Sequence, residues 1–260
     1  MKFKRKYLSI PYAIFLSLFV IIPIALIIFY AFTDVDGHLS FDAAKNFFSN
    51  KGNWDVLLVS LFIALEATAL CLIIGFPIAY FLANKKYNKN AVLVMLFIMP
   101  MWINFVLRTT ATRDILFAIG INGGNYPYLA TLIGMVYNYL PFVILPLYTT
   151  MLKLDKSQIE ACADLGANPT QVFFKSILPQ SLPGIISAIT MTFVPVMSSY
   201  VISDALSEGN IALVGNFIYL NFANNQWNNG SFMAFVLLIL VAISMFATKG
   251  EKEENRGGLW

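Results

Sequence analysis

The chain has 260 residues, of which 58% are hydrophobic and only 12% charged, whereas soluble globular domains carry roughly a quarter charged residues. This composition argues against a water-soluble fold. Because the length is divided into apolar runs, it also leaves no room for a fused ATPase. We therefore expect one helical membrane domain over residues 1–260 with a net charge of +3.

Six apolar segments are candidates to cross a hydrocarbon core about 30 Å thick, which takes about 20 helical residues. In chain order they are residues 11–32, 56–83, 91–107, 128–152, 185–201 and 231–247. The third, fifth and sixth are close to the short limit. All six should be helices, because unpaired backbone groups are too costly in lipid and the runs lack the two-residue alternation of a barrel.

The first span follows the basic residues Lys2, Lys4, Arg5 and Lys6, as a signal peptide would. Its apolar run is longer than a signal peptide needs, and no small-x-small cleavage pattern follows it. We therefore favour an uncleaved first helix.

Basic residues indicate the orientation. If the N-terminus is cytoplasmic and the spans alternate, thirteen of the seventeen Lys and Arg residues fall inside. The four outside are Lys45, Lys51, Arg108 and Arg113. Cytoplasmic loops are enriched in basic residues, so both termini are expected in the cytoplasm.

The expected outer face is net acidic, with seven carboxylates against four basic residues. The carboxylates are Asp34, Asp36, Asp42, Asp55, Asp114, Asp204 and Glu208. A negative vestibule concentrates cationic solutes, because a low-dielectric cleft focuses the field. An equally good explanation of these carboxylates is that the loops are simply polar, with no role in attracting a solute.

The inside loop at residues 153–183 carries helix signals. Ser157 and Glu160 fit a capping box that starts a short cytoplasmic helix, and Gly166, Asn168 and Pro169 stop it. A second helical piece is expected at residues 170–177.

After this second piece, Leu178-Pro179 and Pro183-Gly184 are expected to turn the chain back into the membrane. The two pieces would form a surface hairpin suited to receive a push from a soluble partner.

Glu160-Ala161-Cys162, then Gly166, then Leu178-Pro179 resembles the EAA loop of binding-protein-dependent transport permeases. Two positions depart from that pattern, since Cys162 replaces an alanine and Ser176 an isoleucine. The resemblance implies that the loop docks in a cleft of an ATP-binding subunit. The docking residues would be Glu160, Ala161, Cys162, Asp164, Gly166, Leu178 and Pro179.

Over nearly the whole chain the sequence resembles the spermidine/putrescine importer permeases. The runs that carry this likeness are GFPIAYFLA at 75–83, PMWINFVLR at 100–108, LPFVILPLYTTMLKLDK at 140–156 and YVISDALSEGNIALVGNFI at 200–218, where Ser207 and Glu208 replace usual glycines. Related permeases for thiamine or ferric iron share parts of the pattern, so those solutes remain alternatives to a polyamine.

This resemblance implies a type I ABC importer permease of the MetI-like architecture in the bacterial inner membrane. Its implied partners are a second homologous permease, two ATP-binding subunits, an extracytoplasmic solute-binding protein, a polyamine and membrane lipid, with no nucleic acid. ATP and Mg would be held by the ATPase partner, and this chain would hold no cofactor.

Glu66, near the middle of the second span, is the first candidate for the substrate pathway. An ionised carboxylate at that depth costs about 2.5–3.5 kcal/mol on insertion scales unless it is paired, neutralised or facing water. A protonated glutamate tolerated by packing is the alternative.

Asp204 is expected to pair with a polyamine, with Tyr200 offering a cation–π contact and Glu208 as a second carboxylate. Trp102 and Asn104 could line the same mouth, although Trp102 could equally be an interfacial anchor.

Arg108 and Arg113 would repel a polyamine and are expected to meet the binding protein instead.

Enzymatic functions find no support in the sequence. The single histidine, His38, lacks partners at metal-ligand spacing, and there is no Walker A sequence to hold ATP. No metal site is expected. Two non-enzymatic alternatives remain: an ion-coupled transporter that uses Glu66 as its proton site, and a membrane anchor or sensor that transports nothing.

Overall fold

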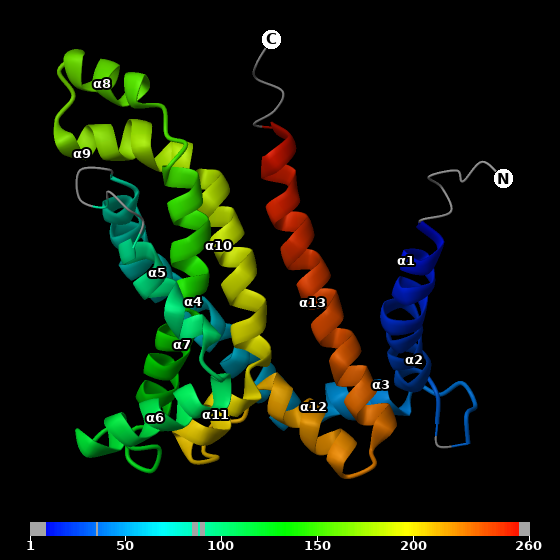
Figure 1. Ribbon diagram of the computed structural model, residues 1–260. Coiled ribbons are helices and arrows are strands. Elements are labelled where there is room, and N and C mark those ends of the chain that lie inside the picture. Colours follow the sequence, from blue (N-terminus) through cyan, green and yellow to red (C-terminus); the bar gives the residue numbers. More distant parts are fainter. Residues whose placement is uncertain (1–8, 35, 85–87, 89–91, 255–260) are drawn as a thin grey trace.

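The computed structural model describes residues 9–34, 36–84, 88 and 92–254 (Figure 1). These residues are helical apart from loops and one isolated bridge between Thr33 and Leu39. The expected all-α membrane fold is confirmed. Five helical stretches are long and apolar enough to cross a membrane, and a bent pair of helices would make a sixth span.

The five long stretches agree with five of the expected spans, with shifted ends. They are Pro11–Ala31, built from α1 (Ser9–Leu16), η2 (Ser17–Ile21) and α2 (Ile22–Ala31); α4 (Lys51–Ala83); α7 (Pro127–Met151); Pro169–Ser198, built from α9 (Pro169–Val172), η4 (Phe173–Ile177) and α10 (Leu178–Ser198); and Trp227–Met245, within α13 (Trp227–Glu254).

The third expected span, residues 91–107, is not one straight helix. It consists of α5 (Val92–Ile98) and η3 (Met99–Trp102), after which α6 (Phe105–Ala118) leaves at an angle of 97°. Pro100 has no backbone N–H, which weakens the helix before the break. Asn104 then starts α6 by accepting hydrogen bonds from the N–H groups of Val106 and Leu107.

The core is formed by α4, α7 and α10, which approach closely at small residues. A Cβ atom on Gly75 of α4 would lie 3.0 Å from Val143 of α7, and one on Gly184 of α10 would lie 2.8 Å from the Cβ of Thr150. Helices in lipid gain stability from such close packing, since lipid offers no hydrophobic drive for association.

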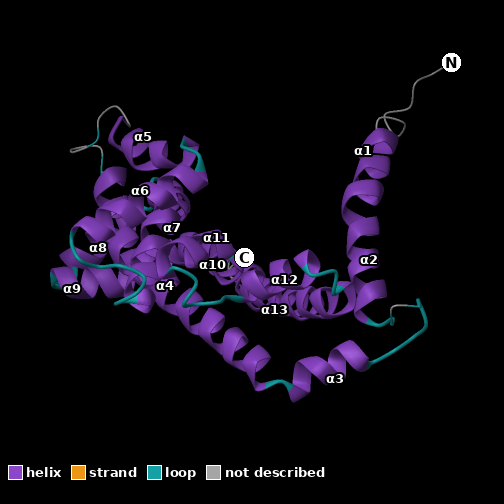
Figure 2. Ribbon diagram, turned by 90° about the horizontal axis from the view of Figure 1, so that it is seen from below, coloured by secondary structure: helices purple, strands orange, loops and turns teal. Residues whose placement is uncertain are grey.

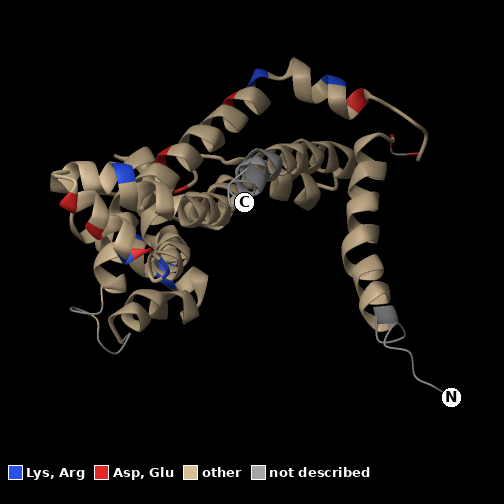
Figure 3. Ribbon diagram, turned by 90° about the horizontal axis from the view of Figure 1, so that it is seen from above, with Lys and Arg blue, Asp and Glu red and all other residues tan. Residues whose placement is uncertain are grey.

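The first span stands apart from this core (Figure 2). None of its apolar window is buried within the chain. Its C-terminal end contacts α13, where Phe32, just beyond α2, packs edge-to-face on Phe232 and Phe235. Figure 3 shows no charged residue along α2.

Short helices occupy the two ends of the bundle (Figure 1). The end that bears α8 (Lys156–Asp164) and α9 also holds the start of α1 and the end of α13, and we name it the hairpin end. The opposite, far end holds α3 (Asp42–Ser49), α6, α11 (Tyr200–Ser207) and α12 (Val214–Ala223). Both ends of the described chain thus share the side of the hairpin.

Candidate functional site: a docking hairpin and an outer aromatic cluster

The docking hairpin (residues 153–183) begins with a cap that differs from the expected one. The N-cap of α8 is Asp155, whose Oδ1 accepts the N–H of Ser157 at 3.0 Å and its hydroxyl at 2.6 Å. These two donors hold the pKa of the Asp155 carboxyl below its usual value. A capping box built from Ser157 and Glu160 is therefore wrong, because the aspartate two positions earlier starts the helix.

A reciprocal capping box does occur at the next helix start. The N–H of Gln171 donates to Asn168 Oδ1 at 2.9 Å, and the N–H of Asn168 donates to Gln171 Oε1 at 3.1 Å. This cap fixes the angle at which α9 leaves the turn.

Gly166 ends α8 in the way that the sequence predicts. Its φ of 85° is left-handed, its N–H donates to Ala163 O at 2.9 Å, and the N–H of Ala167 donates to Cys162 O at 3.3 Å. This pair of hydrogen bonds is the Schellman motif, which favours glycine because other residues are strained at positive φ.

The expected turn back into the membrane at Leu178-Pro179 and Pro183-Gly184 is wrong. The chain runs as one helical stretch from Pro169 to Ser198. Pro179 is the second residue of α10, and just before it the N–H of Leu178, the C-cap of the π-helical segment η4, donates to Phe173 O. The hydrogen-bond register changes at this point, so a missing proline N–H is tolerated.

Most of the expected docking residues are accessible in this chain. Glu160, Ala161, Asp164, Gly166 and Pro179 are exposed, and Cys162 and Leu178 are half-buried. The sequence analysis overlooked Leu165, which is 89% exposed at the tip of the hairpin. An apolar side chain so exposed beside a helix end was a signal that could have been used.

The hairpin is joined to the membrane helices by specific contacts. The N–H of Asp155 donates to Gln180 Oε1 at 2.8 Å, and Gln180 Nε2 donates to Ser176 Oγ at 3.2 Å. Phe173 packs edge-to-face on Phe76 of α4, with ring centroids 5.5 Å apart. A cavity of about 250 Å³ between the ends of α4 and α7 is closed on one side by Glu160 of α8.

At the far end, Tyr200 and Asp204 lie one turn apart on α11 and so share a helix face. Asp204 is exposed. The Tyr200 ring stacks on Tyr219 of α12 with centroids 5.1 Å apart and planes 10° apart. Tyr219 was not expected from the sequence, since it lies in a different helix.

Glu208 is placed in different surroundings. It ends α11 with a left-handed φ of 53°, and it lines a cavity of about 310 Å³ together with Arg113 and Asp114 of α6.

Glu66 lies on an exposed face of α4 and accepts a 2.5 Å hydrogen bond from the hydroxyl of Tyr128 on α7. The carboxylate thus has a polar partner 62 residues further along the chain, which spacing alone did not reveal.

Comparison with known proteins identifies the family. The chain is 34% identical over 207 residues to the spermidine/putrescine transport system permease protein PotB of Escherichia coli, covering 74% of this chain and 75% of that protein. It is 32% identical over 265 aligned residues to PotB of Haemophilus influenzae, covering 94% and 92% of the two chains. The chain belongs to the PotB permease family. No family model matches the sequence.

Solved structures show the same fold. A bacterial ABC transporter involved in the import of the acidic polysaccharide alginate aligns with a TM-score of 0.67 over 94% of both chains at 15% identity. The inward-facing MetNI methionine ABC transporter aligns with a TM-score of 0.55 over 75% of this chain and 92% of that one, at 20% identity. The expected importer-permease architecture and membrane location of this permease are confirmed.

Two further residues expected to line the substrate pathway lie at the break in the third span. Trp102 is 85% exposed. The side-chain oxygen of Asn104 caps α6 by accepting N–H groups at 2.9 and 3.3 Å, so its acceptor is engaged in the fold.

Arg108 is buried, contrary to the expectation that it meets a partner at the surface. It is 7% exposed. Its guanidinium donates to Asn138 Oδ1 and to Pro100 O, both at 2.7 Å, and lies 5.9 Å from the Tyr137 ring centroid. The guanidinium thus joins the segment before the break to α7, and the linear sequence does not show this pairing.

His38 is not isolated either. One ligand atom from each of Asp34, Asp36 and His38 lies within 4.8 Å of the others. The loop reverses through the bridge between Thr33 and Leu39, which brings the three together. His38 Nδ1 is 3.9 Å from Asp34 Oδ2, and the histidine side chain is 82% exposed.

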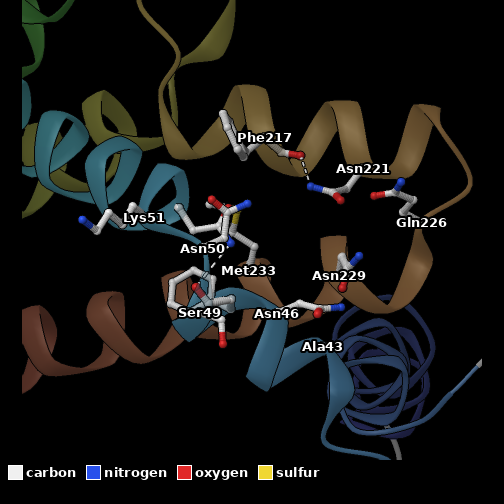
Figure 4. A pocket seen from close by; sticks show the side chains of 12 residues that line it. Ala43, Asn46, Ser49, Asn50, Lys51, Phe217, Asn221, Gln226, Asn229 and Met233 are labelled. Atoms are coloured by element: carbon white, nitrogen blue, oxygen red, sulfur yellow. Dashed lines mark hydrogen bonds between the residues drawn. The ribbon is translucent and has the colours of Figure 1, made fainter.

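A polar cavity of about 630 Å³ opens between α3, the start of α4, α12 and the start of α13 (Figure 4). Carboxamides dominate its lining, and Asn221 donates to Phe217 O at 2.8 Å on one wall. The residues that line it include Asn46, Asn50, Asn53, Asn221, Gln226 and Asn229.

Proposed function

We propose that this permease forms half of the membrane pathway of an ATP-driven importer for polyamines. The observation that carries the proposal is its identity with PotB permeases over most of the chain. The exposed hairpin that is continuous with a membrane span supports the coupling role. The chain itself would hydrolyse no ATP and hold no cofactor, since ATP and Mg belong to the partner ATPase.

The docking hairpin acts as a lever in this proposal. The stretch Pro169–Ser198 has 30 residues, so it is about 45 Å long at 1.5 Å per residue. A displacement of α8 by a closing ATPase dimer is passed through Gln180 and Phe173 to α10 and α4. ATP then shifts the balance between inward-open and outward-open states without a chemical step in this chain.

The exposed surfaces of the chain indicate where each proposed partner would bind. The first span has no buried window, so it needs a second permease or lipid around it. Leu165 and Glu160 offer one apolar and one acidic contact to one ATP-binding subunit, and the second permease would dock the other. A solute-binding protein would dock at the far end, which places the hairpin end and both termini in the cytoplasm.

The substrate is proposed to be spermidine or putrescine, which the names of the PotB relatives specify for those proteins. Asp204 at the far end supplies the negative charge that an ammonium group requires. Thiamine and ferric iron are the alternative solutes. Glu66 is the one feature that favours an ion-coupled carrier. The Tyr128 hydroxyl donates a hydrogen bond to the Glu66 carboxylate, and this bond accounts for a carboxylate within the span without a role in proton transport.

Reconstitution tests this proposal. The complete transporter is reconstituted in proteoliposomes from the permease, its partner permease, the ATPase and the binding protein. It should import radiolabelled spermidine only when ATP is present on the ATPase side of the membrane. Uptake driven by a proton gradient without the ATPase would overturn the proposal in favour of the ion-coupled carrier.

Asp204→Asn should lower spermidine uptake in this assay, because the amide keeps the shape of the side chain and removes its charge. Co-purification of the subunits should be unchanged. Asp114→Asn is the matched control, since Asp114 is an exposed carboxylate of the far end already paired with Arg113 at 3.1 Å. Equal uptake by the Asp204 and Asp114 variants would remove Asp204 from the pathway.

A further inference from the structure

We propose that Tyr219 completes, with Tyr200 and Asp204, a subsite that receives one ammonium group of the solute at the far end. The inference rests on the proposed polyamine function and adds to it an aromatic residue from a separate helix.

The two rings form an accessible aromatic surface. They lie nearly parallel, 10° apart with centroids 5.1 Å apart, so the stack itself covers one face of each ring. Tyr219 is 53% exposed and Tyr200 is 36% exposed. Two large aromatic side chains half-open to solvent are costly to leave bare, and a cation above a ring face is the ligand that such a surface attracts.

The position of Tyr219 is fixed by a close approach of α12 to the end of α10. A Cβ atom on Gly215 would lie 2.2 Å from Ser198 O and 3.3 Å from the Tyr200 Cβ. Only glycine allows this distance. Tyr219 follows Gly215 by one helical turn, so the contact carries its ring over Tyr200.

The surrounding charge also favours a cation. The chain has no Lys or Arg between Lys175 and Lys249, and α11 contributes Asp204. Glu208 lies in the cavity that also holds Arg113, so Asp204 is the carboxylate assigned to the subsite. It follows Tyr200 by four residues, so the two side chains share one face of α11. An ammonium group can thus contact the carboxylate while adjacent methylene groups rest on the aromatic surface.

The subsite sits where the lever ends. Ser198 closes the stretch that begins at Pro169, and the hydroxyl of Tyr139 on α7 donates to Ser199 Oγ at 3.1 Å. A movement of α10 therefore reaches Tyr200 directly.

Spermidine imported per ATP hydrolysed, measured with the complete reconstituted transporter and saturating loaded binding protein, tests the subsite. A spermidine molecule that leaves the binding protein and is held poorly by the permease returns to the outside, while the ATPase still hydrolyses ATP. Tyr219→Leu should lower the ratio about two- to fivefold, since a cation–π contact at an exposed site contributes about that factor. Tyr219→Phe keeps the ring and should retain the wild-type ratio, and Leu220→Ala, an exposed neighbour on α12, should do the same.

A wild-type ratio for Tyr219→Leu would overturn the subsite while leaving the polyamine proposal intact. An equal loss in Tyr219→Phe would also overturn it, because the hydroxyl or helix packing would then be responsible. A wild-type transporter that imports neither spermidine nor putrescine would overturn the polyamine proposal itself, and this inference with it.

Discussion

At the scale of single residues, the docking hairpin depends on one backbone conformation. Gly166 reverses the chain with φ of 85°, and nothing lies within 4 Å of where its Cβ would be. Its requirement is therefore conformational rather than steric inside this chain. The open space above it is available to a partner.

Gly166→Leu should abolish co-purification of the ATPase subunit, because the side chain strains the turn and fills the docking surface. Gly120→Leu is a closely matched control, since Gly120 has φ of 84° and equally open surroundings but lies just after α6 at the far end. Loss of the ATPase from both variants, or from neither, would contradict a docking role for the turn.

The cap of α8 gives a pH dependence. Because the pKa of Asp155 is lowered in the folded state, the cap stabilises α8 above the ordinary aspartate pKa of about 3.9 and is lost as the pH falls through the lowered value. A spin label at Ala163, an exposed position of α8, should become more mobile over that acidic range. In Asp155→Ala the label should be mobile at every pH, and an unchanged titration there would assign the effect to another group.

At the scale of elements, the broken third span is held by a buried charge. The Arg108 guanidinium joins Pro100 O, before the break, to Asn138 of α7. It thereby pairs the buried Asn138 Oδ1 and adds a charged donor to Pro100 O, which also accepts the N–H of Ile103 at 3.3 Å. In a low-dielectric interior these charge-assisted hydrogen bonds fix the bend of 97° between the two helices.

Arg108→Leu should therefore destabilise the permease, since Asn138 Oδ1 loses its charged donor and a buried acceptor left unpaired costs about 1–3 kcal/mol. The thermal unfolding midpoint in detergent should fall clearly below that of the wild type. Arg113→Leu removes the same charge from the same helix, but Arg113 pairs with Asp114 at a solvent-exposed site, and the midpoint of this variant should stay close to wild type. Equal midpoints for the two variants would contradict the structural role of Arg108.

The sequence predicted the elements that depend on local signals. Long apolar runs located five spans, and Gly166 located the end of α8. Three features escaped it, two because they depend on contacts between separate helices and one because a change of helical hydrogen-bond register leaves no mark in the residue pattern. The break after Trp102 requires the partner Asn138, the continuity through Pro179 requires a π-helical register shift, and the stack on Tyr200 requires the close approach at Gly215.

At the scale of the whole molecule, the exposed surfaces of the chain are those expected of one subunit in a larger assembly. Its first span is bare, its hairpin exposes Leu165, and its far end exposes an aromatic and acidic cluster. One 30-residue helical stretch connects the last two. The family and the coupling motif were available from sequence, while the residues that link hairpin to pathway became visible only in the packed structure.

Labelling of introduced cysteines in intact cells tests most directly that the hairpin faces the ATPase side. In a Cys162→Ala background the remaining native cysteine, Cys71, is buried. Leu165→Cys and Leu39→Cys then place thiols at sites that are 89% and 86% exposed at opposite ends. A membrane-impermeant thiol reagent should label position 39 in intact cells, and position 165 only after lysis and only when the ATPase subunit has been removed. Labelling of position 165 from outside intact cells would contradict the account.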